Sequence, residues 1–120
     1  MKLNRIEKNL MKALEAMDII DAHEHLGPEA KRVETRVDVF TLFSHYTRGD
    51  LFVAGMSEEA HKSLSDHKIP LDRCWETFAP YWEQIRYGSY ARAALLAAQR
   101  FYDVDDINEN TYEQLSHAMQ

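Results

Sequence analysis

Two histidines separated by a single residue are the sharpest chemical feature of this sequence. His23 and His25 end the segment Ile19-Ile20-Asp21-Ala22-His23-Glu24-His25, whose β-branched start is typical of a short strand. Alternate residues of a strand face the same way, so the two rings would stand side by side, with Cα atoms roughly 6.5–7 Å apart. Their nitrogens could then converge on one divalent ion, with bonds of about 2.0–2.1 Å to zinc. Asp21 shares that face and could orient a histidine ring as a hydrogen-bond acceptor.

The same pair has a plainer interpretation, since a bare His-x-His motif often occurs by chance. Ligation is favoured because the pair ends a hydrophobic segment and is followed at once by the turn residues Gly27 and Pro28. A catalytic zinc usually has three protein ligands and one open position. The sequence offers no obvious third ligand, so it predicts at most an incomplete metal site and no complete catalytic set.

A second candidate group lies at His45-Tyr46-Thr47-Arg48. A helix that carries His45, Tyr46 and Arg48 next to one another could donate hydrogen bonds to an anionic substrate. Alternatively, Tyr46 packs into a core while His45 and Arg48 face water. The residue pattern by itself favours this second interpretation.

The elements that would position these residues follow from the apolar spacing. Apolar residues three and four apart predict an amphipathic N-terminal helix on Leu3, Ile6, Leu10, Leu14 and Met17. The short strand follows, and residues 29–36 are charged without a clear period, which favours a loop.

The rest of the chain has helical patterns. The N-terminal caps that we expect are Asp38, Ser57, Ser89 and Asn110 or Thr111. Pro70 suits a first helical turn, and after it an apolar stripe holds Leu71, Cys74, Trp75, Phe78, Trp82 and Ile85. Pro80 lies inside that stripe and should kink or split the helix. In total we expect about six helices and one strand.

Composition narrows the function classes. The chain has 120 residues and a net charge of −6, without a basic cluster of the kind that duplex nucleic-acid binders show. No apolar run approaches the ~20 residues of a membrane span, and the N-terminus lacks the apolar region of a signal peptide. The single cysteine, Cys74, favours the cytoplasm. We therefore expect neither nucleic acid nor a membrane as a partner.

The segment from Asp21 to His25 resembles the first-strand His-x-His of the amidohydrolase superfamily, the metal-dependent (β/α)8 barrels. The stretch from Val39 to Leu51, followed by Ala54-Gly55-Met56, is similar to the uronate-isomerase-like branch, where a helical insertion after strand one carries a similar His-Tyr pair. The stretch from Trp75 to Val104 is similar to the helical region of that branch.

This resemblance implies a mainly α chain with one short strand, the N-terminal part of a distorted (β/α)8 TIM barrel with a helical insertion after strand 1. Residues 1–28 would hold the N-terminal helix and the first barrel strand, and residues 29–120 the inserted helical subdomain. His23 and His25 would bind a divalent metal, most often zinc. His45 and Tyr46 would approach a small-molecule substrate, with Arg48 a further candidate.

A complete barrel needs ~250 residues, so the resemblance implies an N-terminal fragment of a hydrolase or isomerase that is inactive alone. Two alternatives remain open at this point. The chain could be a stand-alone helical interaction module that uses its aromatic stripe as an interface, or one half of a split enzyme. We also expect self-association, or a second chain that completes the barrel.

Overall fold

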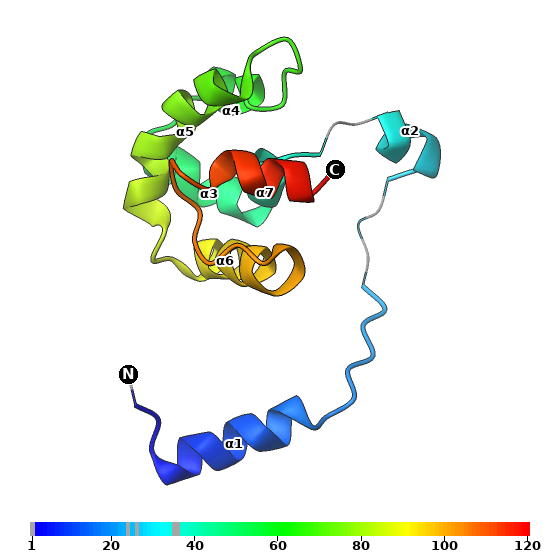
Figure 1. Cartoon of the computed structure of the whole chain (residues 1–120), viewed down its shortest axis with the longest axis vertical. Helices are drawn as coiled ribbons and strands as arrows, with labels where there is room; N and C mark the ends of the chain where they lie inside the picture. The colour runs from blue at the N-terminus through cyan, green and yellow to red at the C-terminus, as the bar shows by residue number, and fades with distance from the viewer. Residues whose placement is uncertain (1, 24, 26, 35–36) are drawn as a thin grey trace. The chain divides into compact units, whose positions relative to one another are not determined.

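A computed structural model describes residues 2–23, 25, 27–34 and 37–120 of the chain (Figure 1). It divides into two compact units, Met1–Arg32 and Val33–Gln120, which we call unit 1 and unit 2. The segments expected from sequence were 1–28 and 29–120.

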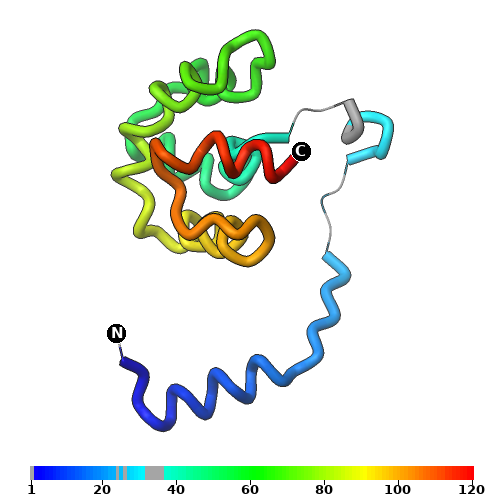
Figure 2. The backbone as a smooth tube through the Cα atoms, in the orientation of Figure 1, coloured from blue at the N-terminus to red at the C-terminus, as the bar shows by residue number. Residues whose placement is uncertain are grey.

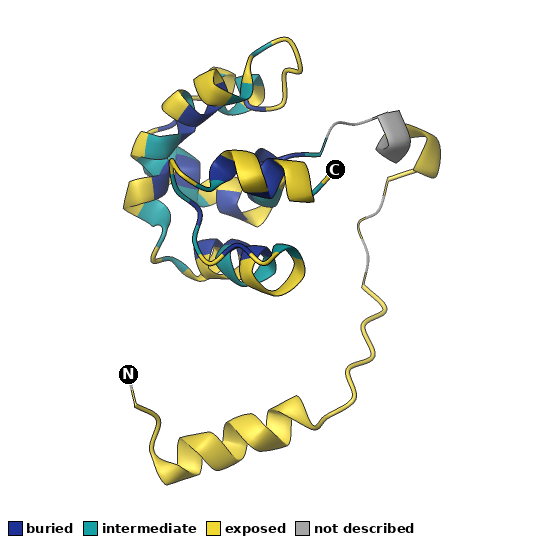
Figure 3. Ribbon diagram, viewed as in Figure 1, coloured by how far each residue is buried: buried dark blue, intermediate teal, exposed yellow. Residues whose placement is uncertain are grey.

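Unit 1 begins with the predicted amphipathic helix, α1 (Arg5–Glu15). Asn4 caps it: its side chain accepts hydrogen bonds from the Ile6 and Glu7 backbone N–H groups, while Glu7 returns a bond to the Asn4 N–H. This reciprocal capping box satisfies N–H groups that a helix start leaves unpaired. The whole helix is exposed, its apolar residues included, as the uniform yellow of Figure 3 shows.

The strand expected at residues 19–23 is absent. The prediction that this segment belongs to a barrel therefore fails as well. The described part of the chain contains helices and no strand. Ile19 and Ile20 are 87% and 94% exposed, and the described residues give them no neighbouring strand. β-branched residues favour extended backbone, but a strand exists only where a second strand pairs with it. The chain is therefore a small helical protein in its described part, and the assignment to a (β/α)8 barrel is wrong.

The charged segment after Pro28 also differs from expectation. Residues predicted as a loop form a short helix, α2 (Glu29–Glu34), while Thr35 and Arg36 lie outside the described residues. Lys31 N–H donates to the Pro28 carbonyl at the start of this helix. Glu, Ala, Lys and Arg have high helix propensity, so the composition of this segment favours a helix although the segment lacks an apolar period.

Unit 2 is an all-helical bundle in its described residues, and Figure 2 follows the chain through it. A 3₁₀ helix, η1, precedes five α-helices joined by short connections. Their bounds are η1 Val39–Phe43, α3 Tyr46–Val53, α4 Glu58–Ser63, α5 Leu71–Ile85, α6 Ser89–Tyr102 and α7 Tyr112–Ala118. Because η1 contacts α3, α6 and α7, it lies at the centre of the packing.

The core of unit 2 is built on the aromatic stripe of α5. Phe43 of η1 packs against Phe78 and Trp82, with ring centroids 4.6 and 5.1 Å away. The Trp82 indole N–H donates to the Ile107 carbonyl at 2.8 Å, which satisfies its polar end inside the core. At the other end of the stripe, Trp75 stacks on Tyr112 of α7 at 4.8 Å. The middle of the stripe is therefore buried core, while its two ends, Leu71 and Ile85, are half-buried.

Pro80 was expected to kink or split α5, and the split does not occur. The helix runs from Leu71 to Ile85 with Pro80 inside it. A proline removes one N–H···O bond from the ladder, which costs most where the orphaned carbonyl is buried. Pro80 and Glu76, four residues earlier, are both exposed, so water can reach that carbonyl.

Candidate functional site

The two histidines of the sequence motif converge in unit 1. Their Nε2 atoms lie 2.7 Å apart, and the rings meet edge to face with centroids 4.5 Å apart. Both side chains are exposed. The two rings therefore meet although the described residues around them form no strand.

This geometry fits two ligands of one metal ion. Two nitrogens bonded to a tetrahedral zinc at about 2.0–2.1 Å stand about 3.3 Å apart, a little more than the distance found here. At 2.7 Å one Nε2 donates a hydrogen bond to the other, so the donating ring must carry its proton on Nδ1 instead before both Nε2 atoms can bind one ion. Among the described residues no group of three or more His, Cys, Asp or Glu side chains could hold an ion. The pair thus provides two ligands and lacks a third within that part of the chain.

Asp21 contacts the backbone beside the pair. Its Oδ1 accepts a hydrogen bond from the His23 backbone N–H at 2.9 Å. This is a local turn of the kind that Asp side chains commonly make, and it fixes the chain just before His23. The structure records no bond from Asp21 to an imidazole ring, so its expected role in orienting a histidine stays a prediction.

The second candidate group, His45, Tyr46 and Arg48, comes together at the start of α3 in unit 2. His45 is the N-cap residue of this helix, and its ring meets the Tyr46 ring edge to face at 4.3 Å. Tyr46 is 59% exposed, so it does not pack into the core, where Thr47 lies instead. The three side chains line one hollow with Ser44, Gly49 and Phe52.

Two residues that sequence reasoning did not select hold this hollow in shape. Tyr90 of α6 stacks on Tyr46 with centroids 5.3 Å apart and planes 11° from parallel. Phe52 lies under the Arg48 guanidinium at 5.1 Å, and its ring also meets the edge of His61. Phe52 lies one helical turn after Arg48, so the spacing along the sequence could have predicted their contact. No local pattern links Tyr46 to a residue on a later helix.

A further histidine, His61, contacts the same Phe52 ring. Its ring is half-buried, with Nε2 3.4 Å from the Phe43 carbonyl oxygen. A neighbouring hollow that includes Arg48, Phe52, His61 and Lys62 contains the acidic side chains of Glu58 and Glu59 as well. The positive charges there are balanced, so this second hollow has no clear preference for an anion.

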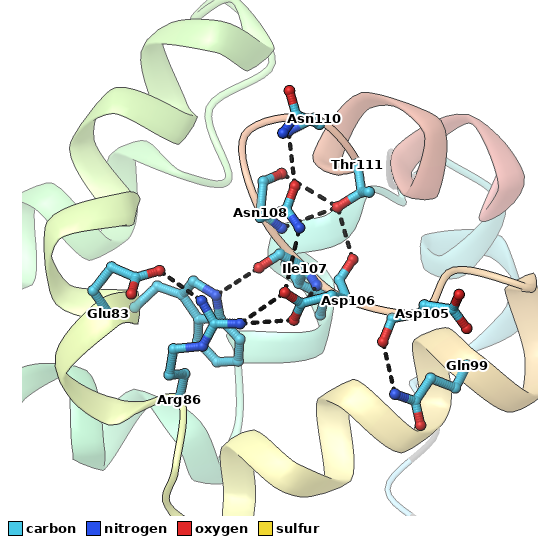
Figure 4. Close-up of polar contacts among 10 residues, drawn as sticks. Glu83, Arg86, Gln99, Asp105, Asp106, Ile107, Asn108, Asn110 and Thr111 are labelled. Atoms are coloured by element: carbon cyan, nitrogen blue, oxygen red, sulfur yellow. Dashed lines mark hydrogen bonds and ion pairs between the residues drawn. The ribbon is translucent and has the colours of Figure 1, made fainter.

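A polar cluster between α5 and the loop before α7 is structural (Figure 4). Arg86 donates two bonds to the Asp106 carboxylate, both 2.8 Å, and one to Glu83. Burial would raise the pKa of Asp106, but hydrogen bonds from Arg86, Asn108 and the Ile107 N–H outweigh it and hold that pKa below its ordinary value. Burial would likewise lower the pKa of Arg86, and its carboxylate partners raise it instead. These charges are satisfied by one another, which makes the cluster a clamp for the loop.

No helix in the described residues is both long and apolar enough to cross a lipid bilayer. Comparisons with protein-family models, with curated proteins and with solved structures found no match for this chain.

Proposed function

We propose that this chain supplies two ligands, His23 and His25, of a divalent metal centre in an amidohydrolase-like enzyme. The observation that carries the proposal is the convergence of their Nε2 atoms to 2.7 Å on an exposed segment. The resemblance of the Asp21–His25 motif to that superfamily supports the same assignment. Zinc is the first choice of metal because imidazole nitrogen is among its usual ligands.

Under this proposal the chain is inactive by itself. A catalytic zinc usually takes three protein ligands, and the described residues group only two here. When bound, such a metal activates a water molecule or polarises a carbonyl. The remaining ligands would come from another chain or segment, as in a split enzyme, and the reaction would be a hydrolysis or an isomerisation.

His45, Tyr46 and Arg48 are the proposed contacts to a small-molecule substrate. Support comes from their shared hollow and from the Tyr90 and Phe52 rings, which hold two of the three side chains in place. The Arg48 guanidinium presents planar hydrogen-bond donors, which suit a carboxylate or phosphate on that substrate. We keep the cytoplasm as the compartment, supported by the single, buried cysteine.

Calorimetric titration with zinc and with manganese tests the metal assignment. We expect micromolar zinc binding by the chain, lost in His23→Ala/His25→Ala. His67→Ala/His117→Ala is the matched control, because it removes two exposed imidazoles elsewhere and should leave binding unchanged. Equal binding by all three proteins, or none by the unmodified chain, would refute the proposal.

The second candidate is an interaction module without catalysis. The observation in its favour is the unpaired apolar face of α1 in unit 1. The surface first expected for such a module, the aromatic stripe of α5, is excluded because Phe78 and Trp82 are fully buried.

A further inference from the structure

The apolar face of α1 is uncovered in the described part of unit 1 (Figure 3). Ile6, Leu10 and Leu14 recur every four residues, so they line one face of the helix. Their side chains are 70%, 60% and 58% exposed. An amphipathic helix normally buries such a face against other apolar groups, as α5 does in unit 2. The face of α1 is therefore free to meet an apolar medium.

The opposite side of α1 is basic. Lys8 and Lys12 follow the apolar residues Ile6 and Leu10 by two positions each. Residues two apart in an α-helix lie on nearly opposite sides, because a full turn takes 3.6 residues. Arg5 lies one turn before Lys8 and extends the same basic side. All three cations therefore lie within α1 and away from the centre of its apolar face.

The acidic residues of α1 leave this basic side largely intact. Glu7 accepts the Asn4 N–H in the capping box, and Glu15 is the last residue of the helix. The helix holds three cations and two carboxylates, whereas the whole chain has a net charge of −6. The acidic excess therefore lies outside α1.

These two sides fit a lipid bilayer with anionic headgroups. A helix that lies in the interface buries its apolar face at the boundary between headgroups and acyl chains, while Lys and Arg on its polar side contact anionic headgroups. A protein groove would cover the apolar face and give the basic side no role. We propose that α1 binds the surface of an anionic membrane, with its apolar face inserted and its basic side among the headgroups.

Surface binding makes smaller demands on the sequence than crossing a bilayer. No apolar run of this chain is long enough to span a membrane, which is why no membrane partner was expected. A helix that lies on the surface needs only one apolar face. Since α1 has 11 residues, that face is short, and binding needs both apolar contact and opposite charge.

Co-sedimentation of the full chain with lipid vesicles tests this proposal. We expect binding to vesicles of equal parts phosphatidylcholine and phosphatidylserine, and several-fold weaker binding to phosphatidylcholine alone. Raising the salt from about 0.05 M to about 0.5 M should weaken binding to the anionic vesicles, because salt screens exposed charges. Amide hydrogen exchange should slow in Arg5–Glu15 on these vesicles and stay unchanged in the helices of unit 2. Equal binding to both kinds of vesicle, or to neither, would overturn the proposal.

One pair of substitutions tests the apolar face. Leu10→Gln removes a central apolar side chain, keeps the net charge and retains a good helix former, so it should weaken vesicle binding about ten-fold. Asn9→Gln introduces the same side chain one turn after Arg5, on the polar side, and should leave binding unchanged. Unchanged binding by Leu10→Gln would exclude insertion of this face.

A second pair tests the basic side. Lys8→Gln/Lys12→Gln removes two cations from α1 and should weaken binding to the anionic vesicles about ten-fold. Lys62→Gln/Lys68→Gln makes the same change at two exposed lysines of unit 2 and should leave binding unchanged. Equal losses in the two double variants would show that net charge, and not the basic side of α1, governs binding.

Other occupants of the apolar face would give different results. A chain that doubles its mass in solution and does not bind vesicles has a second copy on α1. Slow hydrogen exchange in α1 without vesicles means that the chain itself covers the face. Either result overturns the proposal. Vesicle binding should persist with a chelator and in His23→Ala/His25→Ala, so membrane binding and the proposed metal site are tested independently.

Discussion

Helices α1 and α5 have the same kind of sequence pattern and different environments. Each carries apolar residues at spacings of three and four, yet the α1 residues are exposed and the α5 residues Phe78 and Trp82 are fully buried. The dark blue inner faces of unit 2 and the yellow α1 in Figure 3 make the difference visible. An amphipathic pattern therefore predicts a helix and a face to be covered, and it does not identify what covers that face.

The difference in burial comes from the elements that each helix contacts within its own unit. The stripe of α5 contacts η1, where the Phe40 and Phe43 rings pack on Phe78. The Ile107 carbonyl accepts a hydrogen bond from the indole N–H of Trp82. In unit 1 the described residues offer α1 no comparable apolar surface. Unit 2 is thus stabilised by its own core, whereas α1 gains little from burial and leaves its apolar residues exposed.

Shortening one leucine in each unit gives the largest contrast. Leu51 is 0% exposed and Leu10 is 60% exposed. We expect Leu51→Ala to lower the free energy of unfolding by about 2–5 kcal/mol, because it leaves a cavity in a packed core. Leu10→Ala, the identical chemical change, should stay within about 0.5 kcal/mol. Denaturant titration followed by circular dichroism measures both, and similar losses would contradict the division between the units.

Removing arginine from the clamp should give a smaller effect. The Arg86 side chain is 17% exposed and its partner Asp106 is 42% exposed, so solvent weakens the pair. We expect Arg86→Ala to cost about 1 kcal/mol of unfolding free energy, since three hydrogen bonds, two to Asp106 and one to Glu83, are lost together with the contact to the Trp82 ring. Arg73→Ala is the control, because its ion pair with Glu76 is mostly exposed and should contribute almost nothing. Equal effects in thermal unfolding would show that the loop clamp adds no stability.

The acid dependence of the same clamp should be smaller still. Because the pKa of Asp106 is lowered in the folded state, its carboxylate stabilises the fold above the unfolded pKa, and this contribution is lost as pH falls through the folded pKa. The melting temperature of Asp106→Asn should lie below that of the unmodified chain above about pH 5, and the gap should close as the pH falls below about 4. Asp105→Asn, which keeps the backbone carbonyl that accepts from Gln99, should show no such gap. A gap that is unchanged at low pH would exclude a contribution from Asp106 ionisation.

Local sequence signals predicted the helix starts well. Asp38 and Ser57 accept hydrogen bonds from the first turns of η1 and α4, as their side-chain chemistry indicated. The prediction of Ser89 as a cap was less accurate, because Gly88 is the N-cap and Ser89 is the first helical residue. The helix that Asp38 caps is the short η1, and α3 begins after Ser44 at a boundary that no strong breaker marks.

The strand prediction failed because a local pattern was used where pairing decides. Ile19 and Ile20 have strand-forming side chains, but no described strand pairs with them. The split expected at Pro80 does not occur, because Pro80 lies on the exposed face of a helix whose other face is well packed.

The sequence by itself determined the helical character of unit 2, most of its caps, the amphipathic α1 and the convergence of His23 with His25, because each depends on neighbours within a few residues. Only the tertiary structure decided that the α5 stripe is core while the α1 stripe is exposed. It also decided that Tyr90 stacks on Tyr46 and that Arg86 binds Asp106. These outcomes join residues far apart in the chain, and long-range packing, which local spacing does not encode, selects those partners.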